Sequence, residues 1–393
     1  MNRTLLIPAV VASLIGAASV FYFHSPSDAS AQEIEVCLEK GAQKEQCLND
    51  LIERAGKENI DAGLDMLAQV YTRDQEFANS CHGTTHTLGE FAYDDFKNET
   101  NFSLSPKTAY CGFGFFHGFM EALLAEGGDI GEARRFCDWA DGDLHDATAG
   151  VSVACYHGIG HGIVDGSDTA TWGDVDAFIA PGLKLCDTLG DNLEHKTRCA
   201  SGVFNSLGGA FFEPKYRLPL DNSDPYAICR TQKLEYQKKA CYDQMNSYVV
   251  PSTQSFAEAL ALAATTPEKE YRQLTVTTVA ALAAKQTLAS NSDAARDLGA
   301  CLRLETGLRV TCANGFANGL IEFGLPGDEF TIPLAACAEA GDLAKSCFDG
   351  VARAAYDRVD RATQERVCLA MRTVDERFGR MCDNIINNRA PDA

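Results

Sequence analysis

The chain has 393 residues, of which 46% are apolar, so it is long enough to bury a large core in one or two domains. Its 55 acidic residues outnumber 34 basic ones, which leaves a formal net charge of −21. A protein this acidic lacks the broad basic patch that binding to phosphate groups requires. Nucleic acid and anionic membrane surfaces are therefore not expected partners, whereas a small molecule or another protein stays open.

The chain opens with an uncharged segment. Residues 4–23 carry no charge and are numerous enough to cross a bilayer as a helix. They are followed by Ala29-Ser30-Ala31, which has the small-x-small pattern of a processing site. Residues 1–31 therefore predict either a cleaved signal peptide or a membrane anchor formed by residues 4–23. In both cases the remainder is exported to a periplasmic or extracellular location, and membrane contact is expected only through this segment.

Sixteen cysteines are spread along the rest of the chain. None of them forms a Cys-x-x-Cys pair, the usual spacing of thiolate metal sites, so disulfide bonds in an oxidising compartment are the better interpretation. Cys81 and Cys111 are expected to pair with each other because the others have closer neighbours. Those other expected pairs are Cys37–Cys47, Cys137–Cys155, Cys186–Cys199, Cys229–Cys241, Cys301–Cys312, Cys337–Cys347 and Cys368–Cys382.

The second cysteines of successive pairs recur at regular intervals. Cys155, Cys199 and Cys241 lie 44 and 42 residues apart, and Cys312, Cys347 and Cys382 are spaced by 35 residues each. The segments between them show apolar stripes at helical spacing, and alternating β-branched runs are scarce. The sequence therefore predicts an all-α fold in which disulfide-stapled helical hairpins form an α-solenoid-like repeat array.

Residues 251–292 interrupt this pattern, because they contain no cysteine and are rich in alanine and threonine. We expect two helices there, without evident N-terminal caps, that join two halves of the chain. The predicted division is a histidine-bearing helical repeat domain at residues 32–250 and a C-terminal helical repeat domain at residues 251–393.

Glycine and histidine occupy different positions of the predicted repeat. Six residues after the second cysteine of a pair, only His117 and His161 are histidines, so histidine is an addition to the scaffold. Glycine costs a helix roughly 1 kcal/mol relative to alanine, so its repetition predicts that neighbouring helices pack closely there. Three residues after the cysteine, five units carry glycine, namely Gly114, Gly158, Gly202, Gly315 and Gly350.

Histidines and acids recur every four residues in three short segments. Two histidines at that spacing lie on one face of a helix and can bind one ion together. The predicted metal ligands are His82, His86, His117, His157 and His161. The predicted catalytic acids, which would bridge ions, orient histidines or shuttle protons, are Glu90, Glu121 and Asp165.

These residues predict an exported metalloprotein that binds one or two transition-metal ions on three neighbouring helices. Imidazole binds iron, copper and zinc, so the ligands do not select the metal. If the protein is an enzyme, we expect a metal-dependent oxidoreductase. The alternatives are a zinc-dependent hydrolase, a non-catalytic repeat protein that binds metal or a partner, and histidines that are merely hydrogen-bonded in a packed core. No nucleophile-elbow, phosphate-loop or dinucleotide motif supports another enzyme class.

Overall fold

The computed structural model describes residues 26–98, 102–144, 150–164, 168–325, 327–359 and 361–388. In these segments all regular secondary structure is helical and there is no strand, which confirms the expected all-α class. The helices of the N-terminal half are α1 (Pro26–Leu38), α2 (Lys44–Glu58), α3 (Ile60–Tyr71), α4 (Gln75–Ser80), α5 (His82–Asn98), α6 (Gly114–Ala125), α7 (Ile130–Leu144), α8 (Val151–Ile163), α9 (Val175–Cys186), α10 (Leu193–Ala210), α11 (Ala227–Thr231), α12 (Glu235–Gln244) and α13 (Asn246–Ser252). Those of the C-terminal half are α14 (Phe256–Ala264), α15 (Lys269–Ala289), α16 (Ala294–Leu298), α17 (Thr306–Glu322), α18 (Thr331–Glu339), α19 (Ala344–Arg358), α20 (Arg361–Val374) and α21 (Glu376–Asn388).

Several helices begin at a side chain that caps their first turn. Asn192 accepts hydrogen bonds from the backbone N–H groups at the start of α10, and Asp74 does the same for α4. The two helices expected between residues 251 and 292 are present as α14 and α15. Ser255 caps α14 by accepting from the Glu258 N–H group at 3.2 Å, so the expectation that this helix lacks an N-cap was wrong.

Eight disulfide bonds join the cysteines in the expected pairs, and none of the cysteines is free. Seven of them link consecutive helical segments. The eighth, Cys81–Cys111, instead joins the start of α5 to the segment that precedes α6. In the chain-entropy account, closing a loop of about 15 residues stabilises the fold by about 3 kcal/mol, because it restricts the unfolded chain. The disulfides therefore hold neighbouring helices together.

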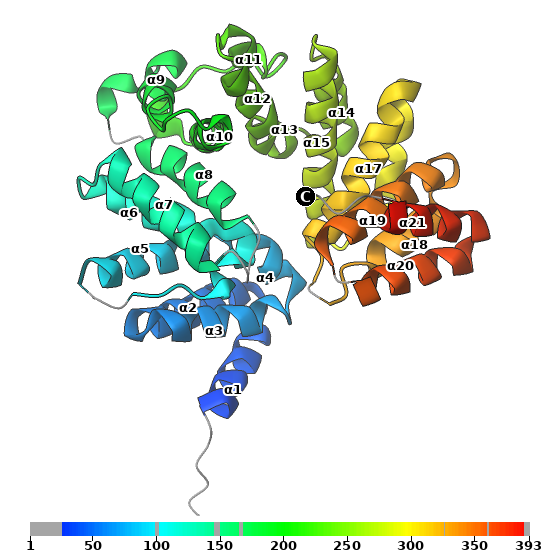
Figure 1. Cartoon of the computed structure of the whole chain (residues 1–393), viewed down its shortest axis with the longest axis horizontal. Coiled ribbons are helices and arrows are strands. Elements are labelled where there is room, and N and C mark those ends of the chain that lie inside the picture. Colours follow the sequence, from blue (N-terminus) through cyan, green and yellow to red (C-terminus); the bar gives the residue numbers. More distant parts are fainter. Residues whose placement is uncertain are drawn as a thin grey trace, which may run out of the picture.

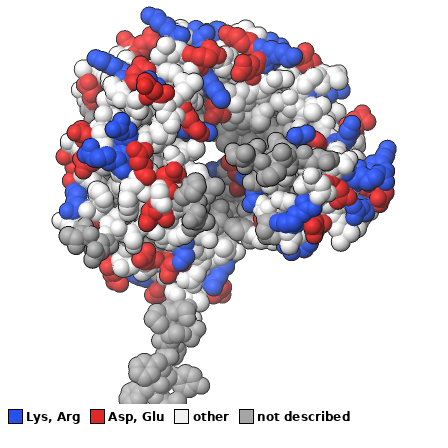
Figure 2. Space-filling view, in the orientation of Figure 1, with Lys and Arg blue, Asp and Glu red and all other residues white. Residues whose placement is uncertain are grey.

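A continuous row of helices connects the two halves. Each packs against the next in the order α5, α6, α8, α10, α12, α15, α17, α19 and α21. Figure 1 shows this row curving around the molecule, from α5 at the lower left over α12 at the top to α19 at the right. The α4 helix packs against α15, and the Gln75 side chain donates a hydrogen bond to the Phe323 carbonyl oxygen at 2.9 Å. The two halves thus meet and close a ring, and Figure 2 shows the hollow at its centre.

Glycines bring the backbones of neighbouring helices in this row into direct contact. A Cβ atom on Gly118 would lie 1.9 Å from the His86 carbonyl oxygen, and one on Gly202 would lie 2.0 Å from the His157 carbonyl oxygen. Atoms cannot approach this closely, so only glycine fits. The predicted packing role of glycine is confirmed, and the contacts fall at the backbone of the predicted metal ligands.

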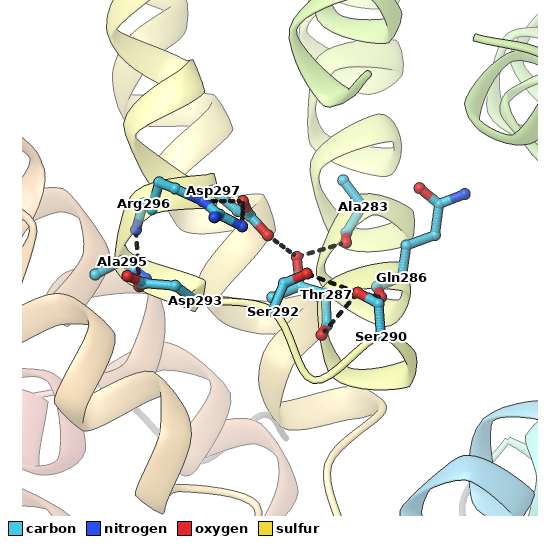
Figure 3. A network of polar contacts seen from close by, with 9 residues as sticks. All are labelled: Ala283, Gln286, Thr287, Ser290, Ser292, Asp293, Ala295, Arg296 and Asp297. Carbon is cyan, nitrogen blue, oxygen red and sulfur yellow. Dashed lines mark hydrogen bonds and ion pairs between the residues drawn. The ribbon is translucent and has the colours of Figure 1, made fainter. Parts of the chain in front are cut away.

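Polar contacts close the turn that follows α15. The Thr287 hydroxyl oxygen lies 3.0 Å from the Ala283 carbonyl oxygen and 3.0 Å from a carboxylate oxygen of Asp297 (Figure 3). Asp293 caps the first turn of α16 in the same network. These contacts fix the C-terminal end of α15.

In the described part of the chain, no helix has both the length and the apolar character that crossing a membrane requires. The apolar run at residues 4–23, predicted to be a signal peptide or an anchor, lies outside the described residues.

The substitution Gly202→Ala tests the backbone contact between α8 and α10. The added methyl group would overlap the His157 carbonyl group, and overpacking of this kind costs about 1–3 kcal/mol. We expect a lower melting temperature by circular dichroism. Gly209→Ala on the same helix is the control, because nothing lies within 4 Å of the Cβ atom added there. Equal melting temperatures for the two variants would contradict the packing role of Gly202.

Candidate metal centre

Three neighbouring helices bring five histidines together. His82 and His86 belong to α5, His117 belongs to α6, and His157 and His161 belong to α8. The ring centroids of His117 and His161 are 4.3 Å apart, and those of His86 and His117 are 5.1 Å apart. The helices therefore converge as the sequence predicted.

The five side chains form two groups that share His117. Potential ligand atoms of His82, His86 and His117 all lie within 4.8 Å of one another, and so do those of His117, His157 and His161. Each group combines one histidine pair with His117. Each group offers three imidazole nitrogens, and metal sites with three protein ligands leave a further position for water or substrate.

Hydrogen bonds determine the tautomers of two histidines. In each, the bond is made by Nδ1, the ring nitrogen on the outside of the cluster, which we call the outer nitrogen. His82 Nδ1 lies 2.7 Å from the Cys111 carbonyl oxygen, which can only accept, so this nitrogen carries the proton. His157 Nδ1 lies 2.7 Å from the Ser201 hydroxyl oxygen, which donates its own proton to the Arg198 carbonyl oxygen. In both histidines Nδ1 is therefore the donor, and Nε2 keeps its lone pair for a metal ion.

The inner ring nitrogens lie close to one another. His82 Nε2 is 3.1 Å from His117 Nδ1, and His157 Nε2 is 3.2 Å from His161 Nε2. His86 Nε2 is buried and has no hydrogen-bond partner among the residues that the structure describes. A buried polar atom without a partner costs free energy, so this nitrogen is available to a ligand that is not part of the chain.

Glu121 contacts two of the histidines from outside. One of its carboxylate oxygens accepts a hydrogen bond from His86 Nδ1 at 3.2 Å, and the other lies 3.8 Å from His161 Nδ1. The Ser206 hydroxyl oxygen also lies 3.0 Å from His161 Nδ1. Because His86 donates through Nδ1, its Nε2 atom has a free lone pair. Glu121 is thus placed to orient the histidines.

The other two predicted acids are placed differently. Glu90 is exposed and lines, together with Glu121 and His161, a cavity of about 790 Å³ near the C-terminal ends of α6 and α8. Burial, and secondarily the charge of Glu121, raises the pKa of Glu90. Asp165 lies outside the described residues, so its role stays a prediction.

Burial keeps most of these histidines neutral. It lowers the pKa of His82 to about 4 and the pKa of His157 to about 3, and neighbouring histidines act in the same direction. It also lowers the pKa of His117 and the pKa of His161 well below the ordinary value. Metal ions bind neutral imidazole, so the site is in its binding form at neutral pH.

Sequence reasoning missed the residues that hold the outer nitrogens. Ser201 follows Cys199 by two residues, as His157 follows Cys155. Successive helices of the row pack in register, so these equivalent positions lie side by side. Alignment of the successive segments on their second cysteines gives Ser201 and His157 equivalent positions, so the sequence could have predicted this contact.

Comparison with known proteins finds no relative of this chain: no family model, no curated protein and no solved structure matches it.

The buried histidines make the metal-free protein sensitive to acid. Histidines of the unfolded chain titrate near pH 6.5, whereas His82 and His157 have pKa values of about 4 and about 3 when folded. Below about pH 6.5 the unfolded state therefore binds protons that the folded state does not. The contribution of these histidines to the free energy of unfolding is therefore fully present above that pH. It falls as the pH decreases, by up to about 1.4 kcal/mol per pH unit for each histidine.

Chemical denaturation of the metal-free protein between about pH 7 and pH 5 measures this loss. The double variant His82→Gln/His157→Gln should lose less stability over the same interval. An identical loss in both proteins would show that these histidines are not the cause.

Glu121→Gln tests the carboxylate that contacts His86. The amide keeps the size of the side chain but removes its charge, and loss of such an outer partner weakens metal binding by about tenfold to hundredfold. Glu213→Gln is the matched control, because Glu213 lines the same cavity. Competition with a chromophoric chelator measures both affinities, and an unchanged affinity in Glu121→Gln would exclude an orienting role.

Proposed function

We propose that this chain is an exported metalloprotein whose five histidines bind one or two transition-metal ions. The observation that carries the proposal is the convergence of five imidazoles, of which His117 is buried and the others are half-buried, and of which His86 Nε2 has no partner among the described residues. Eight disulfide bonds are compatible with the oxidising environment of an exported protein.

We further propose oxidoreductase chemistry on a small substrate, with copper as the preferred metal. Within the described residues, both ligand groups consist of histidine alone. Imidazole also binds iron, but non-haem iron oxygenase sites combine two histidines with a carboxylate, so a ligand group of imidazole alone resembles such a site less and favours copper or zinc. Copper is the redox-active member of that pair. The open position of each three-histidine group would take oxygen or substrate.

Zinc-dependent hydrolysis is the second candidate, and one observation favours it. Three histidines with an open fourth position are also a pattern of catalytic zinc, which activates a bound water. Glu90 and Glu121 line the cavity beside His161, where a carboxylate can act as general base on that water. A coloured, redox-active preparation supports the first candidate, and a colourless preparation loaded with zinc supports the second.

We propose the following architecture for the chain. The disulfide-linked helical pairs form an α-solenoid-like repeat array, in which residues 32–250 carry the metal centre and residues 251–393 form the facing half. The packing of each helix in the row against the next, and the contact of α4 with α15, support this description.

Metal analysis of protein purified from its exported location tests the function. We expect one to two equivalents of copper or zinc per chain. His117→Ala should reduce binding at both groups, because both include this residue. His195→Ala is the control, since its ring stacks on Tyr156 and belongs to neither group. Less than one metal per chain in the unaltered protein, or full binding by His117→Ala, would refute the proposal. Bound metal without activity would leave a non-catalytic metal-binding protein.

A further inference from the structure

A second cavity of about 470 Å³ lies at the opposite ends of the histidine-bearing helices. His82, His117 and His157 form one of its walls, and residues of α15 and α17 form another. His82 is the first residue of α5, so this second cavity lies at the N-terminal ends of the histidine-bearing helices. The first cavity, which Glu121 lines, lies toward their C-terminal ends. The second cavity is bounded by both halves of the ring.

Two basic side chains line this second cavity, Lys285 of α15 and Arg198 of α10. Both act on the histidines through their charge: Lys285 contributes to the lowered pKa of His82, and Arg198 contributes to that of His157. The Lys285 ammonium lies 5.3 Å from the centroid of the Phe323 ring. The two cations therefore lie within electrostatic reach of the histidine groups.

An acid in the same cavity is already paired. Glu322 lines the cavity, but its carboxylate accepts a hydrogen bond from the Arg358 guanidinium group at 3.0 Å. Lys285 itself forms no ion pair with any residue that the structure describes. Burial lowers the pKa of Lys285, which reflects the cost of removing the ammonium group from water, and the charge of Glu322 opposes this effect only in part. An anion in the cavity would offset that cost.

The two cavities differ in charge. The cavity at Glu121 is also lined by acids, and none of its described lining residues is a lysine or an arginine; those further acids are Glu90, Asp94, Glu126 and Glu213. An anion is repelled from that side and attracted to the side of Lys285 and Arg198. Although the chain has a net charge of −21, the two cations in the second cavity favour an anionic ligand there, and the acids of the first cavity do not.

Lys285 lies near the C-terminal end of α15. It lies two residues before Thr287, whose hydroxyl group contacts Ala283 and Asp297 at the end of α15 (Figure 3). The same helix packs against α4, immediately before the α5 helix that carries His82. These contacts set the position of the Lys285 backbone relative to the α5 helix.

We propose that this second cavity binds a small anionic molecule through a carboxylate or phosphate group held by Lys285 and Arg198, beside the metal ions. The inference deepens the proposed function, because it names the substrate class of the same centre. The two cations belong to the chain itself, so anion binding can be tested with and without metal.

Isothermal titration calorimetry with inorganic phosphate, and separately with succinate, tests the inference on the full chain in metal-loaded and metal-free form. Lys285→Met removes the charge and keeps the apolar stem. A hydrogen bond to a charged group contributes about 1.5–3 kcal/mol, so we expect at least about tenfold weaker binding of the better anion. Lys269→Met is the matched control, since Lys269 is exposed at the start of the same helix. Lys285→Arg should retain binding.

Tenfold or greater weakening in Lys285→Met, with unchanged binding in Lys269→Met and Lys285→Arg, supports the inference. It is overturned if neither anion binds the unaltered protein, or if Lys285→Met binds as tightly. If Lys285→Met does not fold, the anion affinity of Arg198→Met is measured in its place, and the same tenfold weakening is expected. Absence of metal together with Lys285-dependent anion binding would refute the proposed function alone, and bound metal without anion binding would refute this inference alone.

Discussion

Backbone contact between successive helices is the constraint on which the site depends. Gly118 lies against the backbone of His86, and Gly202 lies against the backbone of His157. When the backbones are this close, equivalent positions of successive helices face each other directly. For this reason His82 Nε2 and His117 Nδ1 lie 3.1 Å apart although the two residues are 35 positions apart in the chain. With ordinary side chains at the glycine positions the helices would stand further apart. The imidazoles would then no longer share a common centre.

Such a centre is costly to fold, because it removes several imidazoles from water. The structure offsets part of that cost through partners for the outer nitrogens: the Cys111 carbonyl group, the Ser201 hydroxyl group and the Glu121 carboxylate. The inner nitrogens have only one another. A metal ion that binds them stabilises the folded state further, since the unfolded chain does not hold the ligands together. The disulfides act in the same direction by restricting the unfolded chain.

Much of the fold and of the ligand set follows from local spacing, and could be predicted for that reason. The intervals between cysteines predict the disulfide-linked pairs of helices. A spacing of four residues predicts that His157 and His161 lie on the same face of a helix. Glu90 and Glu121 each follow a histidine by four residues, yet only Glu121 contacts two histidines, because α6 lies between α5 and α8. Lys285 lines the same cavity as His82 because each helix of the row is turned relative to the one before it until the two halves meet. No local sequence pattern predicts that arrangement.

The most direct test of the account is a crystal structure with anomalous diffraction recorded at the absorption edge of the bound metal. The account predicts anomalous density at the centre of one or both histidine groups, with the Nε2 atoms of His82, His86 and His157 at bonding distances of about 2.0–2.1 Å. Density confined to the protein surface, with the five imidazoles hydrogen-bonded only to one another, would contradict it.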